Sequence, residues 1–231
     1  MTSVVSSPVL SSPVLPGPVL SSPVLSSPVL PGTEGSVRGP AFADNHERII
    51  DAGYRLFSRR SVRDVAMDGI VVASGVAKAT LYRHFPTKDD LVLAILDRRE
   101  VDWTFGTVER GARSRSTHPE GRLLAIFDVF DDWFQRDDYE ACTFINVLLE
   151  MGADHPLGRA SAGHLANMRD IVSGFAAEAG LTEPDEFARS WHILMKGCIV
   201  LAAEGDRCAA RRARALGAML IAANRATEAS D

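Results

Sequence analysis

Six polar side chains gather in residues 78–88 and indicate what this sequence could bind. They are Lys78, Thr80, Tyr82, Arg83, His84 and Lys88. Lysine and arginine pair with phosphates or with guanine edges, and hydroxyl groups donate to phosphate oxygens. Because Val76, Leu81 and Phe85 recur at helical spacing among them, we expect a helix over 77–84 that turns the polar set outward. Such a surface suits nucleic acid, and an ordinary solvated helix face is the alternative.

Two further helices are predicted ahead of this one. An apolar stripe predicts the first over 44–58, and the second covers 66–73. The stripe consists of Ile49, Ile50, Gly53, Leu56 and Phe57. Gly75 follows the second helix and can take the positive φ that a steep turn requires. Two short helices joined by such a turn form a helix-turn-helix, whose second helix enters the major groove of DNA.

A fourth helix is predicted to begin just after Pro86, which cannot continue the third. Thr87 and Asp90 have the spacing of an N-cap with its acidic partner. Lys88 and the free N–H groups of the first turn would add an anion site. The charge distribution agrees, since residues 44–90 hold eight basic and seven acidic side chains in a chain of net charge -5. Nucleic acid would therefore favour this segment.

Residues 47–96 resemble the N-terminal DNA-binding domain of the tetracycline-repressor (TetR) family of bacterial transcription regulators. The resemblance is carried by Ile49-Ile50-Asp51-Ala52, Leu56-Phe57, Met67-Asp68-Gly69-Ile70, the run from Ser74 to Phe85, and Thr87-Lys88-Asp89-Asp90-Leu91. It implies DNA contacts at Thr80, Tyr82, His84 and Lys88, with Lys78 at the start of the helix. The sequence departs from the family pattern at Ser61, Ala66, Ala77 and Ala79. Loss of a helix cap there costs about 1 kcal/mol.

Beyond residue 91 the pattern is helical throughout, so the predicted fold class is all-α. Helices are expected over 88–113, 120–136, 142–153, 158–180, 183–204 and 206–226. We expect three parts: an arm over 1–40, a helix-turn-helix domain over 41–90, and a helical ligand-binding and dimerisation domain over 91–231. The arm repeats Ser-Ser-Pro-Val-Leu and should be disordered and partly polyproline-like. A start codon downstream of the arm is the alternative.

Aromatic and methionine side chains concentrate in the middle of the second domain. Such a mixture suits a mostly apolar cavity with few polar groups, although any one of these residues is more often part of a core. The candidates are Trp103, Phe127, Phe130, Phe134, Phe144, Met151, His164 and Met168. We expect a small hydrophobic or aromatic effector that shifts the fourth helix, so that the two recognition helices of a dimer no longer match their half-sites.

The last two helices are the expected homodimer interface, because a twofold-related pair of short helices reads two half-sites. The candidates are Phe187, Trp191, Leu194, Met195, Cys198, Leu216 and Leu220. The alternative is that this face packs only within one subunit.

Other classes of protein find little support. No catalytic motif or dinucleotide fingerprint occurs, and Asp154-His155 with Ser161 and His164 is better explained as a surface loop than as a catalytic set. Three cysteines without C-x-x-C spacing predict neither a zinc site nor a disulfide framework. We expect a cytoplasmic protein without cofactor, metal or membrane span. The favoured function is a repressor that binds a double-stranded DNA operator and is released by a small molecule. A helical ligand-binding or scaffolding protein with a vestigial helix-turn-helix is the alternative.

Overall fold

The computed structural model describes residues 40–226, and the predicted arm therefore lies almost wholly outside the described part. The described chain is helical, as predicted. Its helices are α1 (Pro40–Phe57), α2 (Met67–Ser74), α3 (Lys78–His84), α4 (Lys88–Arg99), the π-helix η1 (Glu100–Glu109), α5 (Arg110–Arg115), α6 (Pro119–Phe134), α7 (Thr143–Met151), α8 (Pro156–Glu178), α9 (Pro184–Ala203) and α10 (Ala209–Asn224). Leu181 and Arg225 form an isolated antiparallel bridge.

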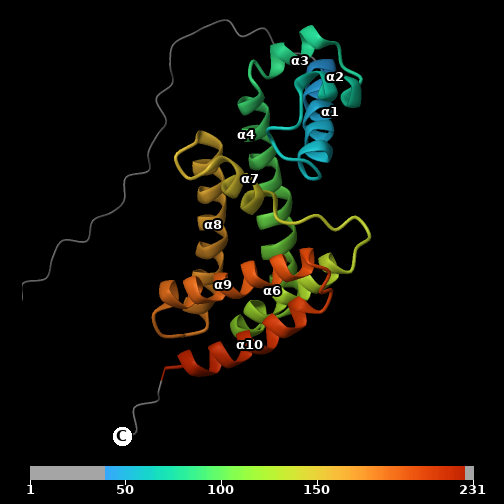
Figure 1. Ribbon diagram of the computed structural model, residues 1–231. Helices are drawn as coiled ribbons and strands as arrows, with labels where there is room; N and C mark the ends of the chain where they lie inside the picture. Colours follow the sequence, from blue (N-terminus) through green and yellow to red (C-terminus); the bar gives the residue numbers. More distant parts are fainter. Residues whose placement is uncertain (1–39, 227–231) are drawn as a thin grey trace, which may run out of the picture. The chain divides into compact units, whose positions relative to one another are not determined.

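Helices α1 to α3 pack together through a small apolar core, and α4 leads away from it (Figure 1). Ile49, Ile70 and Leu81 bring one fully buried side chain from each short helix. Gly53 lets α1 approach α4 closely, since a Cβ there would lie 2.7 Å from the Cδ1 atom of Ile95. The predicted apolar stripe of the first helix thus packs into the core, as expected.

The turn between α2 and α3 has the geometry that the sequence indicated. Gly75 has φ +65°, and its N–H donates to the carbonyl of Val71. The guanidinium of Arg48 on α1 donates to the carbonyl of Ser74 at 2.8 Å, which ties the turn to the first helix. As expected from the alanines at 66 and 77, neither α2 nor α3 has a side-chain cap. Thr87 and Asp90 form the predicted capping box at the start of α4.

The single helix predicted over 88–113 is continuous but changes type along its length. Residues Glu100–Glu109 wind as a π-helix between α4 and α5. The Thr107 hydroxyl donates to the carbonyl of Asp102 at 2.8 Å, and a Cβ on Gly106 would lie 2.9 Å from the carbonyl of Val101. The wide turn therefore leaves little room for a side chain at position 106, which is a glycine. π-Helical turns are rare and occur frequently at functional sites.

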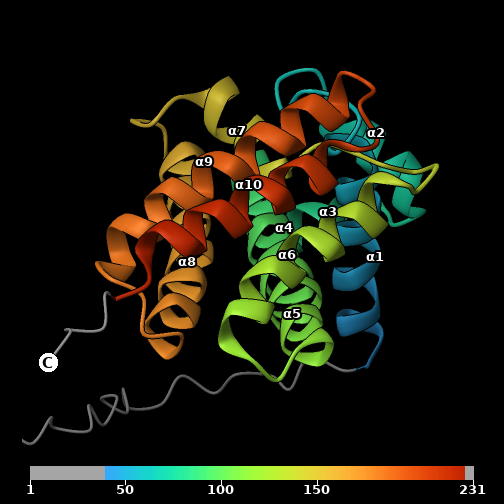
Figure 2. The same cartoon turned by 90° about the horizontal axis from the view of Figure 1, so that it is seen from below.

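Helices α6, α8, α9 and α10 enclose the larger core, and Figure 2 shows α10 lying along α9 and α6. Its centre consists of fully buried aromatic residues, among them Phe127, Phe134, Phe175 and Trp191. Gly217 brings α10 against that centre, since a Cβ there would lie 2.8 Å from the Trp191 ring.

The core of α1 to α4 continues into the second half of the chain. Phe144 and Val147 of α7 and Leu157 and Leu165 of α8 are buried in the same cluster as Leu91 of α4. The division at residue 90 stays a prediction. None of the helices in residues 40–226 combines the length and the apolar character that a bilayer-spanning helix requires.

Candidate nucleic-acid interface and ligand cavity

Helix α3 presents a polar outer face and buries its apolar one. Leu81 is fully buried, and Val76 and Phe85 flank it in the core. Lys78 and Arg83 are exposed, and the Tyr82 side chain is 39% exposed. The side chain of Thr80 is half-buried. These four candidates therefore lie on one short helix at or near its solvent surface.

Two of the predicted contact residues are already engaged within the chain. The ammonium of Lys78 lies 2.7 Å from a carboxylate oxygen of Asp68 on α2, and this hydrogen bond raises the pKa of Lys78. Because both side chains are exposed, the pair contributes little to stability, and a phosphate can displace the carboxylate. The ammonium of Lys88 donates to the carbonyl of Val65 at 3.1 Å and to that of Arg63 at 3.4 Å. Lys88 thus also holds the loop between α1 and α2.

His84 differs from the expectation that its ring faces outward. It follows Leu81 by three residues, which places it toward the same side of α3 as the buried leucine. Its ring is half-buried and stacks on Phe42 of α1 at 3.7 Å between centroids, with the His46 ring at 5.6 Å. Its role in DNA contact stays a prediction.

A carboxylate from the second half of the chain also accepts hydrogen bonds from the loop between α1 and α2. Glu150 on α7 accepts from the backbone N–H groups of Val62 at 2.7 Å and of Arg63 at 2.8 Å. The loop carbonyls are held by Lys88, and the loop amides are held by Glu150. The helix-turn-helix is therefore hydrogen-bonded to α7 as well as packed on α4.

A small cavity lies among η1, α6, α7, α8 and α9, and it encloses about 20 Å³. Five of the eight ligand candidates line it. These are Trp103, Phe130, Phe144, His164 and Met168. Phe127 and Phe134 are instead fully buried in the core of the bundle, and Met151 packs on the core around α1 to α4. Those three side chains contribute to packing and do not line the cavity.

Several lining residues were missed by the sequence analysis. They are Thr104, Cys142, Ile145, Leu165, His192, Met195, Lys196 and Ile199. Only Lys196 had a visible signal, as the single charge that interrupts the apolar run of α9. Burial raises the pKa of the Cys142 thiol, and burial together with the charge of Arg169 lowers the pKa of Lys196.

His164 lines the cavity and lies beside residues of α4 and η1. Its Nδ1 atom lies 2.9 Å from a carboxylate oxygen of Glu100, and its Nε2 atom lies 3.4 Å from one of Asp97. These contacts do not have hydrogen-bond geometry. No group of three potential metal ligands occurs within the described residues.

Comparison with known proteins identifies the first domain. Residues 49–95 match the profile of the family described as bacterial regulatory proteins, tetR family. A TetR-family transcriptional regulator from Streptomyces coelicolor has the same fold, with a TM-score of 0.73 and 25% identity over 80% of this chain and 97% of its own. Residues 49–95 therefore form a DNA-binding domain of the tetR type.

Curated relatives of this chain are transcription regulators, which fits the expectation that it is not an enzyme. The HTH-type transcriptional activator FasR of Mycolicibacterium smegmatis is 32% identical over 105 residues, covering 45% of this chain and 47% of FasR. An HTH-type transcriptional regulator of Staphylococcus aureus is 34% identical over 55 residues, covering 24% of this chain and 30% of that protein. The match thus spans less than half the length of each relative. The fold of reduced Escherichia coli NemR is also similar, with a TM-score of 0.69 and 20% identity over 80% of this chain and 99% of its own.

Most of the residues predicted for a dimer interface are buried within one subunit. Phe187, Trp191, Met195 and Cys198 are at most 3% exposed within one subunit, because they form the side of α9 that faces the bundle. Leu194 and Leu220 are partly buried against the same core, and Leu216 is 51% exposed. An interface on these helices would instead use their outer apolar side chains. Those are Ile193, Val200, Leu201, Leu216 and Met219.

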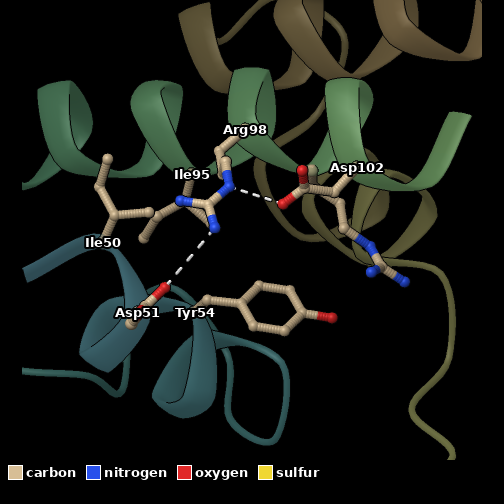
Figure 3. Close-up of a pocket in the computed structure, with 7 residues that line it drawn as sticks. Ile50, Asp51, Tyr54, Ile95, Arg98 and Asp102 are labelled. Carbon is tan, nitrogen blue, oxygen red and sulfur yellow. Dashed lines mark hydrogen bonds and ion pairs between the residues drawn. The ribbon is translucent and has the colours of Figure 1, made fainter. Parts of the chain in front are cut away.

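Arg98 on α4 links α1 to the start of η1. It lines a cavity of about 120 Å³ between α1 and α4, and Figure 3 shows it between Asp51 and Asp102. Its Nε atom donates to a carboxylate oxygen of Asp102 at 2.6 Å, and a second nitrogen lies 4.0 Å from Asp51. Glu47 of α1 also pairs with it. One cation thus bridges α1 and the start of η1.

Proposed function

We propose that this chain is a tetR-family regulator that represses transcription as a homodimer on a palindromic operator and leaves the operator when a small hydrophobic effector enters the cavity. The observation that supports DNA binding most directly is the face of α3. Lys78, Tyr82 and Arg83 are exposed there, while Leu81 anchors the helix in the core. Exposed cations and hydroxyls on a short, rigidly held helix suit phosphates and base edges of the major groove.

The dimer is supported by the apolar outer faces of α9 and α10. Ile193 is 72% exposed and Met219 is 69% exposed, which is unusual for large apolar side chains on two adjacent helices. A second copy packed on these faces would bury them in a four-helix arrangement. It would also present two α3 helices to half-sites about 34 to 36 Å apart.

The lining of the cavity and its place beside η1 support the proposed release by an effector. About 20 Å³ holds roughly one water, whereas a cavity of about 150 Å³ accommodates benzene. Any organic ligand must therefore displace the lining elements. Trp103 and Thr104 belong to η1, which continues α4, and α4 packs against α1. A ligand that stabilises the expanded cavity would bias the position of the DNA-binding domain.

A fluorescence anisotropy titration with the DNA that flanks the gene tests the proposal. We expect tight binding that falls steeply with salt. Tyr82→Ala and Arg83→Ala should each weaken binding by about tenfold, a loss of about 1.4 kcal/mol within the range for single base or phosphate contacts. Arg110→Ala, which removes an exposed arginine from α5, is the matched control.

If both α3 variants bind DNA like the wild type, the assigned face is wrong. If the wild-type chain does not bind DNA, a ligand-binding or scaffolding protein with a vestigial helix-turn-helix becomes the better description. Sedimentation velocity on Met219→Glu tests the dimer separately, and we expect this variant to be monomeric. A dimer that survives the charge would place the interface elsewhere.

A further inference from the structure

Positive charge gathers at the α9 side of the ligand cavity without an acidic partner. Lys196 lines the cavity and is half-buried. Within residues 40–226 its ammonium forms no ion pair or hydrogen bond. Arg169 on α8 lies close enough to lower the pKa of Lys196, and its guanidinium has only the carbonyl of Leu165 as a described hydrogen-bond acceptor, at 3.4 Å. Burying a charge without a partner is costly, and the charge of Lys196 is available to a ligand.

Two buried polar atoms of the same cavity also lack partners. The Thr104 side chain is fully buried, and its hydroxyl oxygen has no hydrogen-bond partner. His192 is 5% exposed, and its Nδ1 atom is likewise unpaired. Burial, followed by the charges of Lys196 and Arg169, lowers the pKa of His192 to about 3, so the ring is neutral at pH 7. Leaving such groups unsatisfied is costly, and a bound polar group would remove that cost.

The rest of the lining is apolar except for His164, whose ring nitrogens lie near carboxylate oxygens of Glu100 and Asp97. Trp103, Phe130 and Phe144 bring aromatic rings, and Met168 and Met195 bring flexible side chains that can move aside for a ligand. No aspartate or glutamate lines the cavity. The polar groups thus lie in an otherwise hydrophobic enclosure, and the charge they offer is positive.

We propose that the cavity binds an amphipathic carboxylate whose apolar body lies against the aromatic and methionine side chains and whose carboxylate pairs with Lys196. The hydroxyl of Thr104 and the neutral ring of His192 donate hydrogen bonds to the same head group, and Arg169 adds to the positive field. This assignment deepens the effector role proposed above and rests on it only for the consequence for DNA binding. The chemistry at issue is an anion on an apolar chain.

Isothermal titration calorimetry of the full chain with decanoate, without DNA, tests the proposal. Decanol and methyl decanoate keep the apolar body and remove the charge, and decyl phosphate replaces the carboxylate by another anion. We expect one decanoate per subunit, with methyl decanoate and decanol at least about tenfold weaker, because a charge-assisted bond is about twice as strong as a neutral one. Lys196→Met should weaken decanoate by about tenfold or more and leave decanol unchanged. Arg110→Met at an exposed position of α5 is the matched control.

Each result decides between named alternatives. Equal affinity for decanol and decanoate, or a Lys196→Met variant that binds decanoate like the wild type, would overturn the assignment. Tighter binding of decyl phosphate would replace the carboxylate by a phosphate ester. If Lys196→Met does not fold, Thr104→Val removes one donor at nearly constant volume and should weaken decanoate but not decanol. Decanoate that binds without changing operator affinity would leave the site in place and refute the effector role.

Discussion

The two hydrogen bonds between Glu150 and the loop that joins α1 and α2 lead to a quantitative prediction. This carboxylate on α7 accepts from the N–H groups of Val62 and Arg63 at 2.7 and 2.8 Å. Cavity residues Phe144 and Ile145 belong to the same nine-residue helix. Glu150→Ala removes both hydrogen bonds and leaves the apolar contacts of α7 in place.

The magnitude follows from the number and kind of these bonds. A hydrogen bond to a charged acceptor contributes about 1.5 to 3 kcal/mol, and partial solvent exposure of the pair reduces this. We take about 2 to 3 kcal/mol for both together, as the loss in free energy of local opening. Since about 1.4 kcal/mol corresponds to a factor of ten, amide exchange of the loop should accelerate roughly 30- to 150-fold.

Hydrogen exchange measured at single residues is the assay. Val62 and Arg63 should lose protection in Glu150→Ala, while the amides of α9 stay unchanged. Glu186→Ala removes an exposed carboxylate that pairs with Arg189 on α9, and it should leave the loop protected. If the loop amides of Glu150→Ala stay within about threefold of the wild-type protection, a difference of about 0.7 kcal/mol, the assigned hydrogen bonds do not hold the loop.

Three further predictions concern the core, pH and the loop lysine. Gly217→Ala gains about 1 kcal/mol of helix propensity but overpacks against Trp191, which costs about 1 to 3 kcal/mol, so we expect net destabilisation in urea unfolding. Gly174→Ala, where a Cβ meets nothing within 4 Å, should stabilise by up to about 1 kcal/mol. The pKa of His192 is lowered from 6.5 to about 3, so the unfolded chain takes up a proton first as pH falls. The unfolding free energy should therefore drop by about 2 kcal/mol between pH 7 and pH 5, and a His192→Gln variant should lose this dependence. Lys88→Met keeps the aliphatic stem but not the donors to the loop, and it should weaken DNA binding about tenfold in anisotropy titrations, a loss of about 1.4 kcal/mol.

The helices could be predicted because their signals are local. The stripe ending at Phe57, the glycine at 75 and the Thr87 cap each determine structure within one or two turns, and all three are confirmed. The π-helix η1 could not be predicted in this way. Its apolar spacing resembles that of an α-helix, and the wide turn is accompanied by side-chain contacts to the backbone, such as the hydrogen bond from the Thr107 hydroxyl to the carbonyl of Asp102.

The direction in which a side chain points was harder to predict where a helix is apolar on several sides. On α9, Trp191 and Ile193 both lie in an apolar run, yet the first is fully buried and the second is 72% exposed. Which side meets the bundle depends on Gly217 of α10, which leaves room for the Trp191 ring. Sequence periodicity therefore predicted the helix but not its inward face.

The cavity and the DNA-binding domain are joined at two places, and this arrangement explains how a small displacement can reach α3. On one side, η1 contributes Trp103 to the cavity lining, and its Asp102 accepts a hydrogen bond from Arg98. Arg98 in turn pairs with Asp51 and Glu47 of α1. Along the other side, α7 carries Phe144 in the lining and Glu150 on the loop. A ligand that separates these elements must stretch one linkage or move α1 to α3 with it. Because packed interfaces change between discrete arrangements and do not deform continuously, movement of the whole domain is the response that the structure favours.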